Sequence, residues 1–141
     1  MDKVVKDMWV NNSAFLLTLV LLICPYASHA YSSGLEGTTH STVMSGVPGG
    51  QPTGGPASME FAIAPVEDGK PTYGKAIVIQ SDREGKYKVA LPPGRYWIGP
   101  KAKALDPAHY RPRAVVFREQ EAVVTEGTFT HLDLSQVGYA P

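Results

Sequence analysis

Two residues in the C-terminal part of the chain have the types and spacing of half a metal site. His131 and Asp133 are two positions apart, so in an extended strand their side chains would project from the same face. A metal site needs a third ligand, which His109 or Asp106 could supply. Polar side chains on the solvent face of a sheet explain the same spacing, and we therefore predict no metal site and no cofactor.

A second group of charged side chains lies at residues 81–85, where Arg83 separates Asp82 from Glu84. Calcium binds about six to eight oxygen ligands, so two carboxylates around a cation are more typical of a hairpin turn. The serines of the chain include no G-x-S-x-G nucleophile elbow. No hydroxyl group, base and orienting group form a recognisable pattern, and we predict no catalytic residues.

The aromatic side chains are the strongest candidates for binding. Trp97 alternates with Tyr96 and Ile98, so it should point outward if those two face the core. An exposed tryptophan near Tyr73 or Tyr110 could stack on a sugar ring or form the centre of a protein interface. The alternative is that Trp97 packs beneath the long loop that follows its strand, and this packed arrangement is the one we favour.

The stretch that positions these residues runs over 74–100, and its pattern predicts three strands and two turns. Residues 75–80 include Ala-Ile-Val-Ile, which is typical of a strand buried on both faces. Residues 86–91 and 95–98 alternate between polar and apolar types, as half-buried strands do. The two turns have residues that adopt turn conformations readily, and these form the turn signature: Asp82, Gly85, Pro92, Pro93 and Gly94.

The rest of the chain continues the β pattern, and no stretch of residues 31–141 has helical periodicity of useful length. Further strands are predicted near residues 35–44, over 59–66, over 114–117 with 121–125, and over 128–134. Asp68-Gly69 predicts a hairpin turn. The composition of residues 46–56 predicts a loop, and residues 101–113 predict a crossover loop with a short helical turn at 106–109.

About seven short strands separated by turns indicate an all-β fold of the β-sandwich type. Its core should be formed by the large apolar side chains that recur on one face of each strand. We predict these as Phe61, Ile63, Ile77, Ile79, Tyr87, Val89, Leu91, Tyr96, Ile98, Leu132 and Leu134.

Residues 1–30 have the layout of a secretory signal peptide. Lys3 and Lys6 precede an apolar run over 14–23, and small residues occupy the positions before a cleavage site after Ala30. The run is shorter than a membrane span, so the chain would contact a membrane only if this segment stayed uncleaved. Lipoprotein anchoring through Cys24 is disfavoured because Ile23 occupies the small-residue position of a lipoprotein box. We predict a periplasmic or secreted protein.

The charges of residues 31–141 exclude one class of partner. The chain has 13 basic and 13 acidic residues, and its signal segment contains two of each sign, so the net charge of residues 31–141 stays at zero. Without a basic surface, we predict no nucleic-acid binding.

Three segments resemble a known family. Residues 81–87 (S-D-R-E-G-K-Y), 91–96 (L-P-P-G-R-Y) and 124–134 (V-T-E-G-T-F-T-H-L-D-L) are similar to signatures of carboxypeptidase regulatory-like domains. The resemblance implies a seven-stranded, Greek-key, transthyretin-like (prealbumin-like) sandwich over residues 31–141. The chain is also similar to the stand-alone exported bacterial members of that family.

The transthyretin fold also includes 5-hydroxyisourate hydrolase, whose family has histidines and an arginine at its site and a Tyr-Arg-Gly-Ser terminus. Here residues 138–141 are Gly-Tyr-Ala-Pro, and His40, His109 and His131 lie in unrelated contexts. The hydrolase interpretation therefore ranks last. We predict a non-catalytic exported module with a structural or protein-binding role at the cell envelope, the alternative being a carbohydrate-binding module.

Overall fold

The computed structural model describes residues 31–140. From Tyr31 onward the chain forms one compact unit. The predicted signal peptide, including Cys24, lies outside the described residues. Within residues 31–140, no helix has the length and apolar character needed to cross a bilayer.

The described residues confirm the all-β prediction. Their only helices are a 3-10 helix, η2 (Tyr73–Lys75), and a short α-helix, α2 (Lys101–Leu105). The structure has eleven strands where the sequence predicted seven, because turns and breaks divide the longer stretches into short segments. The strands are β1 (Gly34–Met44), β2 (Thr53–Pro56), β3 (Glu60–Glu67), β4 (Lys70–Pro71), β5 (Ile77–Gln80), β6 (Lys86–Ala90), β7 (Gly94–Gly99), β8 (Val115–Phe117), β9 (Gln120–Val124), β10 (Phe129–His131) and β11 (Leu134–Tyr139).

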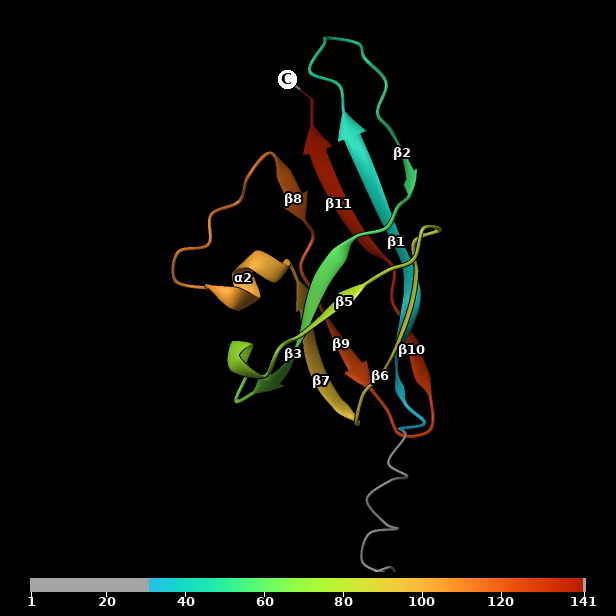
Figure 1. Cartoon of the computed structure of the whole chain (residues 1–141), viewed down its shortest axis with the longest axis vertical. Coiled ribbons are helices and arrows are strands. Elements are labelled where there is room, and N and C mark those ends of the chain that lie inside the picture. Colours follow the sequence, from blue (N-terminus) through green and yellow to red (C-terminus); the bar gives the residue numbers. More distant parts are fainter. Residues whose placement is uncertain (1–30, 141) are drawn as a thin grey trace, which may run out of the picture. The chain divides into compact units, whose positions relative to one another are not determined.

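The first sheet, here called sheet 1, is built around β1. Its strand order is β10-β1-β11-β8, and β2 and β6 also pair with β1. Along one edge, β1 pairs in parallel with β10 and then with β11; along the other, it pairs antiparallel with β6 and then with β2. Figure 1 shows the far ends of β1 and β11, together with β2 and β8, extending beyond β3, β7 and β9.

The second sheet, sheet 2, has the order β4-β3-β7-β9, with β5 also paired to β3. The hairpin between β3 and β4 turns at Asp68 and Gly69, whose φ angles are 52° and 75°. Two consecutive positive φ angles are typical of the type I′ turn that Asp-Gly favours. The predicted hairpin is therefore confirmed.

The core lies between the two sheets and is centred on Phe61 from β3. The Phe61 ring meets the Tyr87 ring edge-on at 5.0 Å and stacks on Phe117 at 6.5 Å, and both partners come from sheet 1. Apolar contact across the gap is what holds such a sandwich together. The buried members are Leu35, Met59, Phe61, Ile63, Tyr87, Leu91, Tyr96, Ile98, Phe117, Ala122, Val124 and Leu134.

Most of the predicted core is confirmed, but the prediction for residues 75–80 is wrong. Ile77 is 40 % exposed and Val78 is 43 % exposed, because β5 lies at an edge of sheet 2 and pairs only with β3. Ile79, Val89 and Leu132 are partly buried against the core. Leu35, Met59, Phe117 and Val124 are core residues that the prediction omitted.

Three further segments differ from the prediction. The helix of the crossover segment is α2, and residues 107–109 form a turn. Part of the predicted loop 46–56 is a strand, β2, because β1 supplies a free edge for it to pair with. The predicted last strand is divided into β10 and β11 at Leu132 and Asp133, where Leu132 instead donates its N–H to the Glu36 carbonyl at 2.8 Å.

A buried hydroxyl pair joins the two sheets. Thr39 is fully buried and Ser81 is 3 % exposed, and their hydroxyl oxygens lie 2.6 Å apart. The Thr39 hydroxyl donates to the Ala57 carbonyl at 2.5 Å, and the Met59 N–H donates to Ser81 Oγ at 2.9 Å. These bonds satisfy the polar groups of both side chains inside the apolar core, where an unpaired group would be costly.

The two predicted turns form as expected in outline. Asp82 Oδ1 accepts the N–H groups of Glu84 at 2.9 Å and Lys86 at 2.8 Å. In the second turn, Gly94 has a φ of 157°, a positive value that residues with a side chain rarely adopt. The Tyr96 hydroxyl donates to the Pro92 carbonyl at 2.6 Å, which gives the Leu-Pro-Pro-Gly-x-Tyr pattern a structural reason.

Replacing Gly85 by alanine should destabilise the first turn. Gly85 has a φ of 78°, and an added Cβ would lie 2.5 Å from the Thr39 carbonyl oxygen. We expect Gly85→Ala to lower the free energy of unfolding by about 1–3 kcal/mol, measured by urea denaturation. Gly74→Ala is the control, since no atom lies within 4 Å of its added Cβ. Equal stability of the two variants would contradict the close approach.

Candidate functional site

Trp97 lies on the outer face of sheet 2, as the alternation predicted, but it is not available to a ligand. It is only 5 % exposed and packs with Ala62, Ala64 and Ala104, the last of which belongs to α2. The Tyr73 ring of η2 meets the indole edge-on at 5.1 Å. The packed arrangement is therefore confirmed, and the exposed stacking platform is wrong, because α2 and η2 cover the ring.

Polar contacts link Trp97 to α2, and Tyr110, the third predicted aromatic residue, lies near the same helix. Trp97 donates its Nε1–H to Glu119 Oε1 at 3.1 Å, and Lys103 Nζ lies 2.7 Å from the same oxygen. This contact raises the pKa of Lys103, whose ammonium also lies 6.0 Å from the centre of the Tyr110 ring. Tyr73 and Trp97 thus pack together beside α2 on the outer face of sheet 2, and Tyr110 lies near Lys103 of that helix.

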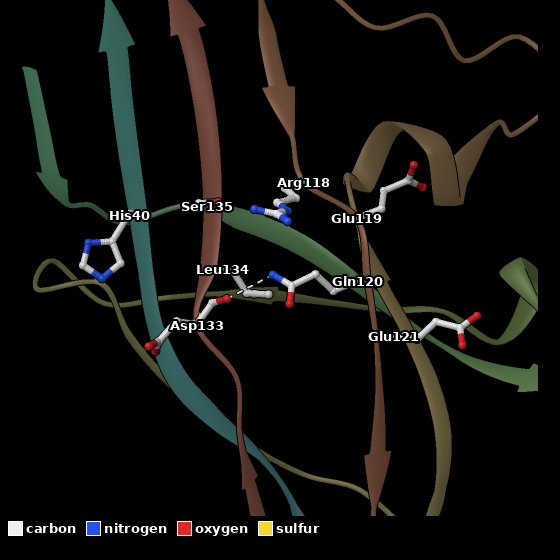
Figure 2. Close-up of a pocket in the computed structure, with 8 residues that line it drawn as sticks. All are labelled: His40, Arg118, Glu119, Gln120, Glu121, Asp133, Leu134 and Ser135. Carbon is white, nitrogen blue, oxygen red and sulfur yellow. Dashed lines mark hydrogen bonds between the residues drawn. The ribbon is translucent and has the colours of Figure 1, made fainter. Parts of the chain in front are cut away.

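An open polar pocket of about 690 Å³ lies between β9 and β11. Its lining residues are His40, Arg118, Glu119, Gln120, Glu121, Asp133, Leu134 and Ser135. Figure 2 shows Arg118 and Gln120 pointing toward β11, while Glu119 and Glu121 point away from it. The Gln120 amide donates to the Asp133 carbonyl at 3.0 Å, so this side chain joins β9 to the residue before β11.

A hydrogen-bond network runs from this pocket along β1. Asp133 Oδ1 accepts the Thr38 N–H at 3.0 Å and the Thr38 hydroxyl at 2.9 Å, and it lies 3.1 Å from His131 Nε2. His40 Nε2 lies 3.0 Å from the Thr38 hydroxyl oxygen. The bonds from Thr38 lower the pKa of Asp133. The carboxylate thereby satisfies the backbone N–H of β1 at the gap between β10 and β11.

The order of groups in this network does not suit nucleophilic catalysis. In a Ser-His-Asp arrangement the acid orients the imidazole, which then takes the proton from the hydroxyl. Here the Asp133 carboxylate itself accepts the hydrogen bond that the Thr38 hydroxyl donates, while His40 Nε2 lies near the hydroxyl oxygen. The network joins β1 to the segment between β10 and β11.

The predicted His131–Asp133 pair does form, but its proposed third ligands lie elsewhere. His109 Nδ1 contacts Asp106 Oδ1 at 3.0 Å in a separate exposed pair. In the described part of the chain, no three His, Cys, Asp or Glu side chains converge into a possible metal site.

Several exposed apolar side chains of the described chain lie where sheet 1 extends beyond sheet 2 (Figure 1). Strand pairing places Val43, Gly138 and Val115 in one row and Met44 beside Tyr139. Because successive side chains alternate between faces, Val43 and Val115 lie on one face of the sheet, and Met44, Val116 and Tyr139 lie on the other. We call these residues, with Val47 in the loop after β1, the apolar end. Its members are between 39 % and 68 % exposed, and they are Val43, Met44, Val47, Val115, Val116 and Tyr139.

The strength of the Thr38–Asp133 contact can be measured through its pH dependence. Because the folded pKa of Asp133 is lowered, its contribution is present above the unfolded value of about 3.9 and is lost as pH falls through the folded value. At neutral pH, we expect Asp133→Asn to be less stable than the original chain by less than about 1 kcal/mol, since the group is exposed. This difference should shrink between about pH 5 and about pH 3. Asp68→Asn, in an exposed turn, is the control, and a pH-independent gap for Asp133→Asn would contradict the assignment.

Several site residues were missed by the sequence predictions. His40 comes from β1, whereas Arg118 and Gln120 lie at the junction of β8 and β9, and the pairing of β11 with both β1 and β8 brings them together. A parallel pair between the first and last strands leaves no local pattern in a sequence. The apolar run of β8, with Arg118 directly after it, was the one available signal.

Comparison with models of protein families, with curated proteins and with solved structures finds no match to this chain. The class of protein is therefore defined by the fold and the surface alone. It is an all-β protein of two sheets, of the β-sandwich type, with a buried tryptophan, an open polar pocket and an exposed apolar end.

Proposed function

We propose that this chain is a non-catalytic, exported β-sandwich module with a structural or protein-binding role at the cell envelope. The proposal includes a carboxypeptidase regulatory-like domain over residues 31–141, with a transthyretin-like Greek-key core of seven strands. In this proposal, the shorter ones among the eleven described strands are additions to those seven core strands. It also includes removal of residues 1–30 as a signal peptide, which places the domain in the periplasm or outside the cell.

The observation that carries the binding role is the apolar end. Exposed apolar patches on soluble proteins mark contact surfaces, because exposed aliphatic side chains gain free energy when a partner covers them. Val47 is 68 % exposed and Tyr139 is 61 % exposed. Both lie on segments paired to, or following, the central strand β1, so the surface has a rigid base.

The polar groups of the described chain support a binding role more than a catalytic one. Asp133 is bonded to Thr38, and Glu119 is bonded to Lys103 and Trp97. These carboxylates stabilise the fold and are not directed at a common point in the polar pocket. A protein partner that covers aliphatic side chains needs neither of them.

The test is photo-crosslinking in cells that express the full chain. A benzophenone amino acid replaces Val47 in the apolar end or, as the matched control, Val123, which is 51 % exposed on β9. We expect a crosslinked envelope protein with the label at residue 47 and none at residue 123. Equal crosslinking at both positions, recovery of the chain only in the cytosol, or turnover of an ester, amide or ureide substrate by the purified chain would overturn the proposal.

A further inference from the structure

Strand β8 forms an edge of sheet 1, with β11 as its only paired neighbour among the described residues. Tyr139 donates its N–H to the Ala114 carbonyl at 3.1 Å, and Arg118 donates its N–H to the Ser135 carbonyl at 3.0 Å. In an antiparallel ladder, alternate residues face the partner strand. The backbone groups of Val115 and Phe117 therefore point away from β11, toward the open edge that Figure 1 shows beside the loop after α2.

A hollow of about 320 Å³ opens next to this edge. Pro100, Ala102 and Tyr110 form part of its wall. Val115, the first residue of β8, also lines it. The lining is mainly apolar, and the volume accommodates a large aliphatic or aromatic side chain. A strand added to β8 would thus find a pocket for one of its side chains beside its backbone bonds.

The charged residues that line the hollow are both basic, Arg111 and Arg113. Asp106 lies beside them in the adjoining hollow, where it is paired with His109. Arg118 follows β8 but points toward β11 (Figure 2). None of the three arginines forms an ion pair with a described residue, whereas the nearby Lys101 and Lys103 are paired with glutamates. Unpaired guanidinium groups beside an edge strand are complementary to carboxylates on an incoming strand.

We propose that the open edge of β8 binds an extended acidic and apolar segment of a partner protein, which adds to sheet 1 as a further strand. The partner backbone bonds to Val115 and Phe117, one of its apolar side chains enters the hollow, and its carboxylates meet Arg111 and Arg113. This is strand addition at a sheet edge, in which backbone bonds supply affinity and side-chain pockets supply specificity. The inference deepens the proposed protein-binding role and depends on it.

The unpaired arginines argue for this occupant. A second copy of the chain, docked through the same edge, would bring two clusters of arginines together without a guaranteed acid opposite them. A membrane surface would contact arginines and valines but would leave the backbone groups of the edge unbonded. Both are outcomes that the experiment separates from a peptide.

The experiment measures binding of an acetylated, amidated peptide of alternating glutamate and valine to the full chain by fluorescence anisotropy. A lysine–valine peptide controls for charge. A third peptide, N-methylated on alternate residues, cannot form the backbone bonds and leaves the protein unchanged. We expect only the first peptide to bind, and more weakly as salt is added.

Variants of the chain locate the site. The double variant Arg111→Glu/Arg113→Glu should weaken binding by about tenfold or more, while Arg83→Glu, an exposed arginine in a distant turn, should change it by less than about twofold. Val115→Pro removes an outward N–H without touching the bonds to β11 and should also weaken binding about tenfold. Thermal melts establish that each variant folds.

Four results would overturn the inference. The first is equal binding of the N-methylated peptide, and the second is peptide binding that the arginine changes leave unaltered. The third is arginine-dependent binding to vesicles containing phosphatidylserine with no peptide binding. The fourth is a dimer of the chain that Val115→Pro dissociates. Crosslinking at residue 47 without peptide binding would refute this inference and leave the proposed function standing. Loss of both would refute the proposed function as well.

Discussion

Replacement of Trp97 by alanine should lower the free energy of unfolding by about 3–5 kcal/mol. The indole is 5 % exposed and fills the space between sheet 2 and α2. The variant leaves a cavity there, and it also removes the Nε1–H that Glu119 accepts at 3.1 Å. Urea denaturation, followed by circular dichroism, gives the change directly.

Two variants separate the packing of Trp97 from its hydrogen bond. Trp97→Phe keeps most of the apolar contact and loses only the bond to Glu119, so it should cost less than Trp97→Ala. Tyr73→Ala removes the edge-on partner from a half-buried position and should also cost less. A Trp97→Ala variant as stable as the original chain would show that the ring is exposed, which would reopen the sugar-stacking interpretation.

Replacement of Phe61 by alanine should have an effect of the same size, about 3–5 kcal/mol. Phe61 is fully buried, and its ring contacts both Tyr87 and Phe117 of the opposite sheet. Its loss removes apolar area from the core and opens a cavity at the point where the sheets meet. We expect the thermal midpoint and the urea midpoint to fall together.

The control for Phe61→Ala is Val123→Ala, in sheet 2 but 51 % exposed. A surface truncation of this kind should change stability by less than about 0.5 kcal/mol. If both variants had the same small effect, the two sheets would not be held by a core centred on Phe61.

The half of the fold that follows local alternation could be predicted from the sequence. Tyr87 and Leu91, and likewise Tyr96 and Ile98, are buried as their alternation indicated, because a strand with one buried face must repeat every two residues. The turn at Asp82 was also predictable, since an aspartate that accepts nearby backbone N–H groups is a local feature.

The arrangement of strands was not predictable in the same way. Ile77 and Val78 have the residue types of an interior strand, yet β5 lies at an edge, because strand order depends on contacts far apart in the chain. Leu35 was missed for the opposite reason. It is fully buried but lies in a stretch of Gly, Thr and Ser, where composition alone favours a loop.

The candidate site shows the same division. Alternation predicted the face on which Trp97 lies, but only α2 and η2 decide whether that face is covered. The His131–Asp133 pair followed from spacing, whereas the bond between Asp133 and Thr38 joins residues 95 positions apart. No local pattern encodes such a contact.

The parallel pairing of β1 with β10 and β11 has a consequence for biosynthesis. β1 obtains neighbours on one whole side only when β10 and β11, which come much later in the chain, have been synthesised. Sequence-distant pairings of this kind slow folding, because the connecting chain must close before they form. The domain therefore acquires its native state only after β10 and β11 have been made, and nascent chains that stop before residue 129 should remain sensitive to protease.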